Sequence, residues 1–277
     1  MLKKPFTEHG ENMIEHVNRR ILILVKTYPS PSSKYIETCC TAGIDDHGNM
    51  IRLYPIPYRR MQKEQQYQKW QWIEVDTIKA RDDKRKESMK AVFSSIKTLN
   101  QITNPSERLN WVLKCPQFLN IEEAKDSPYS LGIIKVDELI ELEFQPEPPN
   151  WTSDQLSKLR QQLEDDLFSN EDIEIEASRQ LEKVPYGFYY HFRSGGSKAI
   201  QRIRITDWEI YQLYRNTRCQ DENVWKGKMI LKYIEQFSKQ DIYLIVGNQH
   251  RFQNQWLCIG VVHLPKGTQA QETMTLF

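Results

Sequence analysis

The segment 74–87 combines carboxylates with basic residues and could support metal-dependent chemistry. Asp82, Asp83 and Lys84 form an acidic-x-lysine pattern like that of metal-dependent nucleases. Carboxylate oxygens bind Mg²⁺, which can stabilise the charge that develops on a phosphate during hydrolysis. This pattern alone assigns no catalytic residue and leaves open whether the chain is an enzyme; the candidates are Glu74, Asp76, Asp82, Asp83, Lys84 and Glu87. In the alternative interpretation the charge run is a solvated loop.

Basic and aromatic residues alternate through positions 52–90, which is the clearest functional signal in the sequence. Lys and Arg exceed Asp and Glu there by five, whereas acidic residues exceed basic ones by eleven in 121–185. Cationic side chains neutralise phosphates, and exposed rings stack on unpaired bases. We expect a nucleic-acid contact surface from Arg52, Arg59, Arg60, Lys69, Arg81, Lys84, Arg85 and Lys86. In the alternative, Tyr54, Trp70 and Trp72 are core residues and the charges form an ordinary wetted surface.

Other chemistry-bearing residues give weaker patterns. His250 and Arg251 lie in a polar turn between two expected strands, and they are further surface candidates. Cys39 and Cys40 are adjacent, so alternation along a strand turns one thiol into the core and favours a structural role over a nucleophilic one. No His and Cys spacing matches a zinc site. We expect no metal and no cofactor, with Mg²⁺ required only if the chain is a nuclease.

The segment 152–176 is strongly acidic and has a helical start. Thr152 and Gln155 have the spacing of a capping box, and leucines recur at intervals of three and four through Leu167. The acidic residues that follow could dock a basic protein partner. They could also cover the basic surface of 52–90, or face away from it and limit non-specific binding.

Composition indicates a folded chain. Hydrophobic residues make up 39% and charged residues 27% of the 277 positions, enough apolar material for a core. The five cysteines are odd in number, which favours reduced thiols and a cytoplasmic location. No window approaches the roughly 18 apolar residues of a membrane helix, and the start of the chain does not resemble a secretory signal.

The first half of the chain reads mainly as strands. The apolar run 20–26 predicts a buried strand, and the turn residues at 45–49 predict a hairpin. Alternation through 70–79 predicts a further strand, and Pro105 predicts the start of a helix.

The proline-rich stretch 145–150 punctuates the chain, and we place a domain seam there. Beyond it we expect a hairpin across 193–197, helices over 206–216 and 222–237, and a final pair of strands around the turn 248–255. These elements indicate an α+β fold with mainly antiparallel pairing. The N-terminal half, 1–145, is expected to be β-rich and partly barrel-like. The C-terminal half, 151–277, is expected to have helices packed on a small sheet, and the two halves could pack as one unit.

Five segments carry a resemblance to a known family: Lys-Thr-Tyr-Pro-Ser-Pro-Ser at 26–32, Ile-Arg-Leu-Tyr-Pro-Ile-Pro at 51–57, Arg-Lys-Glu-Ser at 85–88, Thr-Asp-Trp-Glu at 206–209 and Val-Gly-Asn at 246–248. On these segments the chain resembles a family of uncharacterised bacterial proteins associated with mobile-element and phage-defence neighbourhoods. The resemblance covers most of 20–264 and implies a role in nucleic-acid biology, but it supplies no catalytic residues.

Together these patterns favour a cytoplasmic protein that binds nucleic acid through 52–90, as an accessory component of a mobile-element or defence system. One alternative is a metal-dependent nuclease that uses the carboxylates of 74–87. The other is a protein-interaction subunit that docks its partner through 152–176. No membrane partner is expected.

Overall fold

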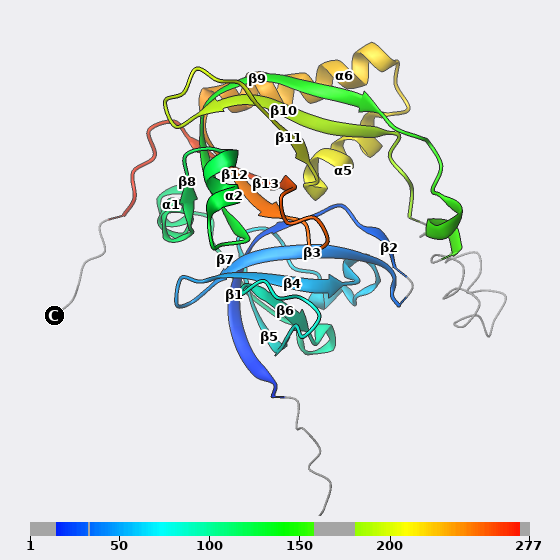
Figure 1. Cartoon of the computed structure of the whole chain (residues 1–277), viewed down its shortest axis with the longest axis vertical. Helices are drawn as coiled ribbons and strands as arrows, with labels where there is room; N and C mark the ends of the chain where they lie inside the picture. The colour runs from blue at the N-terminus through cyan, green and yellow to red at the C-terminus, as the bar shows by residue number, and fades with distance from the viewer. Residues whose placement is uncertain (1–14, 33, 158–180, 272–277) are drawn as a thin grey trace, which may run out of the picture.

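The computed structural model of this protein describes residues 15–32, 34–157 and 181–271. Two β-sheets dominate it, one formed by the first half of the chain and one by the second (Figure 1). Among the described residues, strands account for 43% and helical segments for 25%. The expectation of a β-rich N-terminal half is confirmed.

The first sheet contains seven strands: β1 (Val17–Lys26), β2 (Ser30–Ser32), β3 (Ile36–Asp45), β4 (Met50–Ile56), β5 (Gln71–Lys79), β6 (Ser88–Ala91) and β7 (Lys97–Gln101). β1 pairs with both β3 and β5, so five strands close into a barrel. The predicted hairpin joins β3 to β4: Asp45 accepts hydrogen bonds from the backbone of His47 and Asn49, and Gly48 has a φ of 90° that favours glycine.

The second sheet contains β8 (Gln117–Phe118), β9 (Leu131–Pro146), β10 (Tyr186–Ser194), β11 (Gln201–Ile205), β12 (Gln240–Asn248) and β13 (Trp256–Pro265). Here β9 pairs with both β10 and β12 and closes a second five-stranded barrel. The expectation of helices on a small sheet was therefore wrong. The long strand β9 supplies both closing edges, and its partners lie too far along the chain for local patterns to reveal.

The helices are few and short. α1 (Pro105–Lys114) connects the two sheets, α2 (Ile121–Asp126) lies between β8 and β9, and α5 (Trp208–Thr217) and α6 (Glu222–Ile230) lie between β11 and β12. Ile210 of α5 and Trp225 and Met229 of α6 are buried against the interior of the second barrel. Among the described residues, no helix has the length and apolar character needed to cross a membrane.

Both barrels have the same strand order. The strands that close the first barrel follow the order β1-β3-β4-β6-β5, and those that close the second follow β9-β10-β11-β13-β12. If the five strands of each barrel are numbered along the chain, both orders are 1-2-3-5-4, and strands 3 and 5 are parallel. This is the Greek-key arrangement of an OB-fold. In the second barrel, α5 and α6 occupy the connection between the third and fourth strands, whereas short 3₁₀ turns (Tyr58–Arg60 and Lys63–Gln65) occupy it in the first.

The two barrels pack side by side through their outer faces. Apolar residues of β1, β3 and β4, including Leu24, Ile44 and Met50, join residues of β9, β12 and β13, including Leu131, Ile245 and Ile259, in one buried cluster. The proline-rich stretch 145–150 joins β9 to β10 and so lies within the second barrel. The division between the two strand circuits falls instead between β7 and β9.

Candidate nucleic-acid interface

Two loops from different barrels contact each other. Residues 80–87 join the fourth and fifth strands of the first barrel, and residues 249–255 join the corresponding strands of the second. Arg85 Nη1 donates to the backbone carbonyl of Asn248 at 2.7 Å, and His250 Nδ1 lies 3.4 Å from Asp83 Oδ1. We call these two loops, with their contact, the loop junction.

Asp83 and Arg85 form the fixed centre of the loop junction. Arg85 Nε and Nη2 donate to the two carboxylate oxygens of Asp83 at 2.9 and 2.6 Å. Partial burial by itself raises the pKa of Asp83, but the hydrogen bonds from Arg85 outweigh it and hold that pKa well below its ordinary value. The Arg85 side chain is only 8% exposed, so it holds the loops together and is not displayed to solvent.

The neighbouring basic residues of the loop junction face solvent. Arg81, Lys84 and Lys86 are exposed in the first loop, and Arg251 is exposed in the second. Lys79 Nζ supports the first loop because it donates to the Lys86 carbonyl at 2.8 Å. The contact between the loops thus brings the segment that carries exposed Arg251 to the loop that carries exposed Arg81, Lys84 and Lys86, although the two are far apart in sequence. Beside Arg251, the ring of Phe252 is 59% exposed.

None of the remaining basic candidates belongs to either of the two loops. Arg52 is 5% exposed and donates to the Ser130 carbonyl at 3.0 Å, so it joins the barrels from within. Arg59 is paired at 3.1 Å with the buried carboxylate of Glu37, and Arg60 is half-buried. Lys69 lines a pocket between the barrels. Arg52 is therefore buried next to loop 80–87, where its backbone N–H also donates to the Glu87 carbonyl at 2.8 Å, whereas Arg59, Arg60 and Lys69 belong to other segments of the first barrel.

The carboxylates considered for metal binding have separate partners. Asp76 accepts from Asn18, Asp82 pairs with Lys90, and Asp83 binds Arg85. Glu87 is buried and accepts hydrogen bonds from the backbone and hydroxyl of Ser130. Across the described ranges no three His, Cys, Asp or Glu side chains converge as a metal site. The shared cleft that the nuclease alternative requires is not formed by these described residues.

Most of the acidic segment 152–176 lies outside the described residues, so its proposed docking or covering role has no structural description. Its expected start is confirmed. Thr152 and Gln155 exchange the hydrogen bonds of a capping box, and the chain is helical over 153–157.

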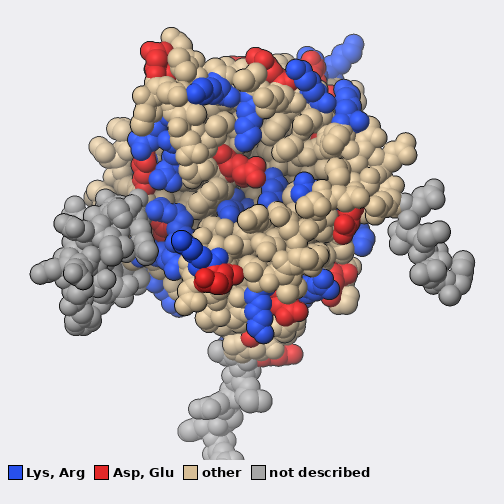
Figure 2. Space-filling view, turned by 180° about the vertical axis from the view of Figure 1, so that it is seen from behind, with Lys and Arg blue, Asp and Glu red and all other residues tan. Residues whose placement is uncertain are grey.

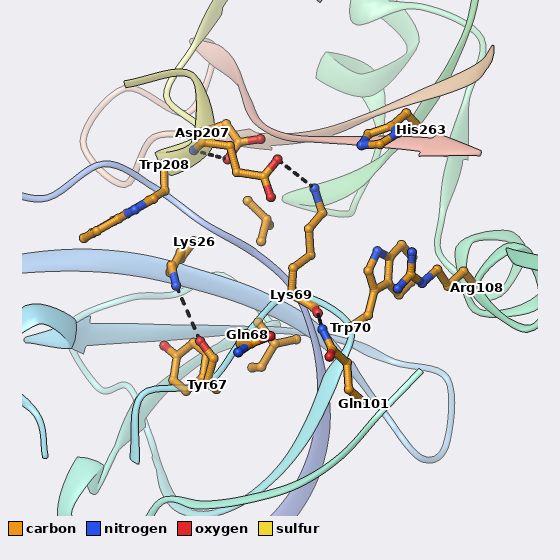
Figure 3. A pocket seen from close by; sticks show the side chains of 13 residues that line it. Lys26, Tyr67, Gln68, Lys69, Trp70, Gln101, Arg108, Asp207, Trp208 and His263 are labelled. Carbon is orange, nitrogen blue, oxygen red and sulfur yellow. Dashed lines mark hydrogen bonds and ion pairs between the residues drawn. The ribbon is translucent and has the colours of Figure 1, made fainter. Parts of the chain in front are cut away.

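A pocket lies between the barrels (Figure 3). This inter-barrel pocket has a volume of about 400 Å³. One wall of the pocket comes from the first barrel and α1: Lys26 ends β1, Lys69 and Trp70 precede β5, and Arg108 lies on α1. The start of α5 forms the opposite wall. Its lining comprises Ile23, Val25, Lys26, Tyr67, Gln68, Lys69, Trp70, Gln101, Arg108, Asp207, Trp208, Glu209 and His263. Seen from behind, Lys and Arg side chains gather in and around a hollow between the two halves of the molecule (Figure 2).

Lys26 is positioned in the inter-barrel pocket by a contact between the barrels. The backbone N–H of Tyr28 donates to the Thr206 carbonyl at 2.8 Å, which places the end of β1 against the start of α5. Lys26 Nζ lies 3.6 Å from the ring centroid of Tyr58 and 5.3 Å from that of Trp208. Burial lowers the pKa of Lys26 to about 8, because desolvation outweighs the attraction of nearby acidic groups.

The acidic groups of the pocket already have partners. Asp207 caps α5, accepting from the Glu209 backbone at 3.1 Å, and its other oxygen accepts from the Val261 backbone at 3.1 Å. Burial raises the pKa of Asp207 to about 6. Glu209 pairs with Lys69 at 3.7 Å. Sequence reasoning missed Lys26 and Asp207 as site residues. Both lie in segments that carry the family resemblance, but no sequence signal indicated that these segments meet.

A third surface is the outer face of β10 and β11, where OB-folds commonly bind oligonucleotides. Tyr189 stands there with Arg202, whose guanidinium lies 3.7 Å from the ring centroid. Each arginine is neutralised: Arg202 binds Glu143 at 2.8 Å, and Arg204 binds Glu147 at 2.7 Å. Hydrogen bonds from Arg202 and His191 lower the pKa of Glu143 to about 2, so the carboxylate stays ionised. This face is electrically balanced.

The solved structures that resemble this chain include one of low similarity. A chain in a structure of a replication protein A heterotrimer bound to ssDNA has 10% sequence identity and a TM-score of 0.36. The similarity covers 95% of this chain and 52% of that one, so this chain spans about half of its length. A TM-score this low supports no inference about fold or ligand. No curated protein matches the chain.

Two family models divide the chain as the barrels do. Domain of unknown function (DUF8758) matches residues 17–114, and Domain of unknown function (DUF8757) matches residues 117–277. Their boundary falls between α1 and β8, where the first sheet has ended and the second begins. Because the second model spans more than half of the 277 residues, the chain belongs to the family described as Domain of unknown function (DUF8757).

Proposed function

We propose that this protein binds single-stranded nucleic acid through the loop junction. The observation that carries the proposal is the contact of loop 80–87 with the second barrel, through Arg85 and Asn248 and through Asp83 and His250, which sets exposed Arg81, Lys84 and Lys86 beside the loop that carries exposed Arg251 and Phe252. In OB-folds, the loop between the fourth and fifth strands is one of the elements that contact oligonucleotides. Here the two barrels present that loop together.

The chemistry of the loop junction suits a flexible strand. Lysine and arginine side chains neutralise phosphates whatever the sequence, and an exposed ring such as Phe252 stacks on an unpaired base. In duplex nucleic acid the bases are already stacked on one another, so this ring has no free base face to contact. The proposal therefore favours single strands, with RNA and DNA compared in the experiment.

The two strand faces support this choice of surface. In the first barrel, the outer face of β3 and β4 is largely buried against the second barrel, where Arg52 holds Ser130. In the second barrel, the β10–β11 face carries arginines that are already paired with glutamates. A phosphate binding there must first displace a carboxylate. An accessory role in a mobile-element or defence system is proposed from the sequence resemblance alone.

The test is binding of fluorescein-labelled single-stranded RNA and DNA across a salt series, measured by anisotropy. We expect the Arg81→Ala/Lys84→Ala/Lys86→Ala variant to bind more weakly, with the slope of log affinity against log salt reduced by about 0.7 per lost phosphate contact. The matched control is Lys198→Ala/Lys228→Ala/Lys239→Ala, which removes three exposed cations of the second barrel and the same net charge. Equal affinities and slopes for the two triple variants would refute the loop junction as the surface. Failure of the wild-type protein to bind either strand at about 50 mM salt would refute the proposed nucleic-acid binding itself.

A further inference from the structure

We propose that the inter-barrel pocket is a separate binding site for a nucleoside phosphate, present either as a free nucleotide or as the phosphorylated end of a strand. The pocket lies away from the loop junction. Lys26 ends β1 beside the segment that leads into β5, whereas loop 80–87 follows the opposite end of β5. The two sites therefore lie at opposite ends of one strand.

The shape of the pocket suits a small ligand. Its volume of about 400 Å³ falls within the roughly 300–1,000 Å³ of typical small-molecule sites. Both barrels contribute walls, and pockets of this kind form preferentially where two domains meet. The backbone contact between Tyr28 and Thr206, and a bridge between Thr27 and Asp207, fix the two walls relative to each other.

Two cations in the pocket are available for a phosphate. Lys26 and Arg108 form no ion pair with any described residue, and the Lys26 ammonium has only a 3.4 Å hydrogen bond to the Tyr67 carbonyl. Arg108 donates twice to the Ile102 carbonyl and retains further N–H donors. The carboxylates do not compete for these cations, because Asp207 accepts from two backbone N–H groups and Glu209 pairs with Lys69. Half-buried cations bind phosphate oxygens through strong, charge-assisted hydrogen bonds.

Planar and amide groups surround the cations (Figure 3). Trp70 and Trp208 line the pocket, and the Arg108 guanidinium lies 5.3 Å from the Trp70 ring centroid. Indole rings stack on nucleobases, and half-buried Trp208 is the more accessible ring, because Trp70 is only 5% exposed. The Gln68 side chain has no hydrogen-bond partner among the described residues. Gln101 donates through Nε2 to the Lys69 carbonyl and keeps its amide oxygen as an acceptor. Amides of this kind pair with the polar edges of a base.

The experiment titrates the full chain with AMP, adenosine and inorganic phosphate and follows tryptophan fluorescence and calorimetric heat. The same variants are then tested with oligonucleotides that carry either a 5′-phosphate or a 5′-hydroxyl. Lys26→Met removes the ammonium but keeps the apolar stem, and Arg108→Gln removes the second cation. Lys198→Gln, at an exposed position in the β10–β11 loop, is the control. We expect AMP to bind more tightly than adenosine or phosphate, and Lys26→Met to weaken it about tenfold or more, as for a lost charge-assisted hydrogen bond.

The outcomes separate this site from the loop junction. Binding of AMP that depends on Lys26 and Arg108 supports a free nucleotide as the ligand, even if oligonucleotides fail to bind. A preference for 5′-phosphorylated oligonucleotides that disappears in Lys26→Met, without AMP binding, supports a strand end. If Lys26→Met changes neither the affinity for AMP nor the preference for a 5′-phosphate, the site is refuted, whatever the affinities of the loop-junction variants. Where AMP does bind, an affinity no higher than that of inorganic phosphate would also refute the site, since the rings would then contribute nothing.

Discussion

Arg85 of the first barrel donates a 2.7 Å hydrogen bond to the backbone carbonyl of Asn248 in the second, and the same guanidinium holds Asp83. This one side chain therefore fixes the conformation of loop 80–87 and its attachment to the other barrel. The exposed side chains of Lys84 and Lys86 have no such contact. Of these three adjacent basic residues, Arg85 therefore stabilises the loop, and Lys84 and Lys86 face solvent.

Arg85→Ala is expected to destabilise the protein by about 1–3 kcal/mol, because it leaves the Asp83 carboxylate and the Asn248 carbonyl without their donor. The measurement is the free energy of unfolding from urea denaturation. Lys84→Ala serves as the control, and as an exposed substitution it should change stability by less than about 0.5 kcal/mol. Equal stability of the two variants would show that the contact does not hold the loops.

Gly260→Ala is expected to loosen the packing of the barrels. A Cβ at Gly260 would lie 2.7 Å from the Cβ of Val25 on β1, closer than packed carbon atoms allow. Such overpacking costs about 1–3 kcal/mol. The matched control is Gly227→Ala in α6, where a Cβ meets no atom within 4 Å. That change should stabilise the helix by up to about 1 kcal/mol. Opposite shifts in melting temperature are the expected result, and parallel shifts contradict it.

Lys26 is expected to make stability depend on pH above neutrality. Its pKa is lowered to about 8 in the folded chain from an ordinary 10.5, so the folded state binds this proton less tightly than the unfolded state. The free energy of unfolding should therefore gain a contribution as pH rises from about 8 to 10.5, on the order of 1–3 kcal/mol.

The groups that face Lys26 do not obscure this titration. Burial raises the pKa of both Cys39 and Tyr58 to about 12, that of Tyr67 lies well above its ordinary value, and the pKa of Asp207, about 6, lies below this range. Comparison of wild type with Lys26→Met by urea denaturation at several pH values isolates the contribution. The variant should be the more stable protein at pH 7, and the difference should shrink toward pH 10.5. A constant difference across the range contradicts the assignment.

Asp207→Ala is expected to cost more than the loss of a helix cap. Asp207 accepts from the Glu209 backbone at the start of α5 and also from the buried Val261 backbone on β13. Loss of both acceptors should destabilise the chain by about 2–3 kcal/mol. Asp221→Ala is the control, because exposed Asp221 caps α6 through the Asn223 backbone and should cost only about 1 kcal/mol. Thermal unfolding of the two variants measures the difference, and equal losses would show that the Val261 contact is not stabilising.

The sequence by itself determined the local elements. The β-branched run before Lys26 formed β1, the turn residues around Gly48 formed the first hairpin, and Asn104 and Asp207 capped α1 and α5. These features depend on propensities and hydrogen bonds within a few residues of chain, which is why local patterns were sufficient to predict them.

Only the tertiary structure decided that the second half closes into a barrel. β9 pairs with β12 through Leu131 and Gly247, more than one hundred residues apart, and no periodicity within either strand specifies that partner. The tertiary structure also decided which basic residues face solvent. The side chains of Arg52 and Arg85 are buried and hydrogen-bonded across the barrels, whereas Lys84 is exposed. Composition gives all three the same charge, whereas burial depends on which distant backbone carbonyl each side chain meets. The pocket has the same origin, because Trp208 and Asp207 come near Lys26 only when the second barrel packs against β1.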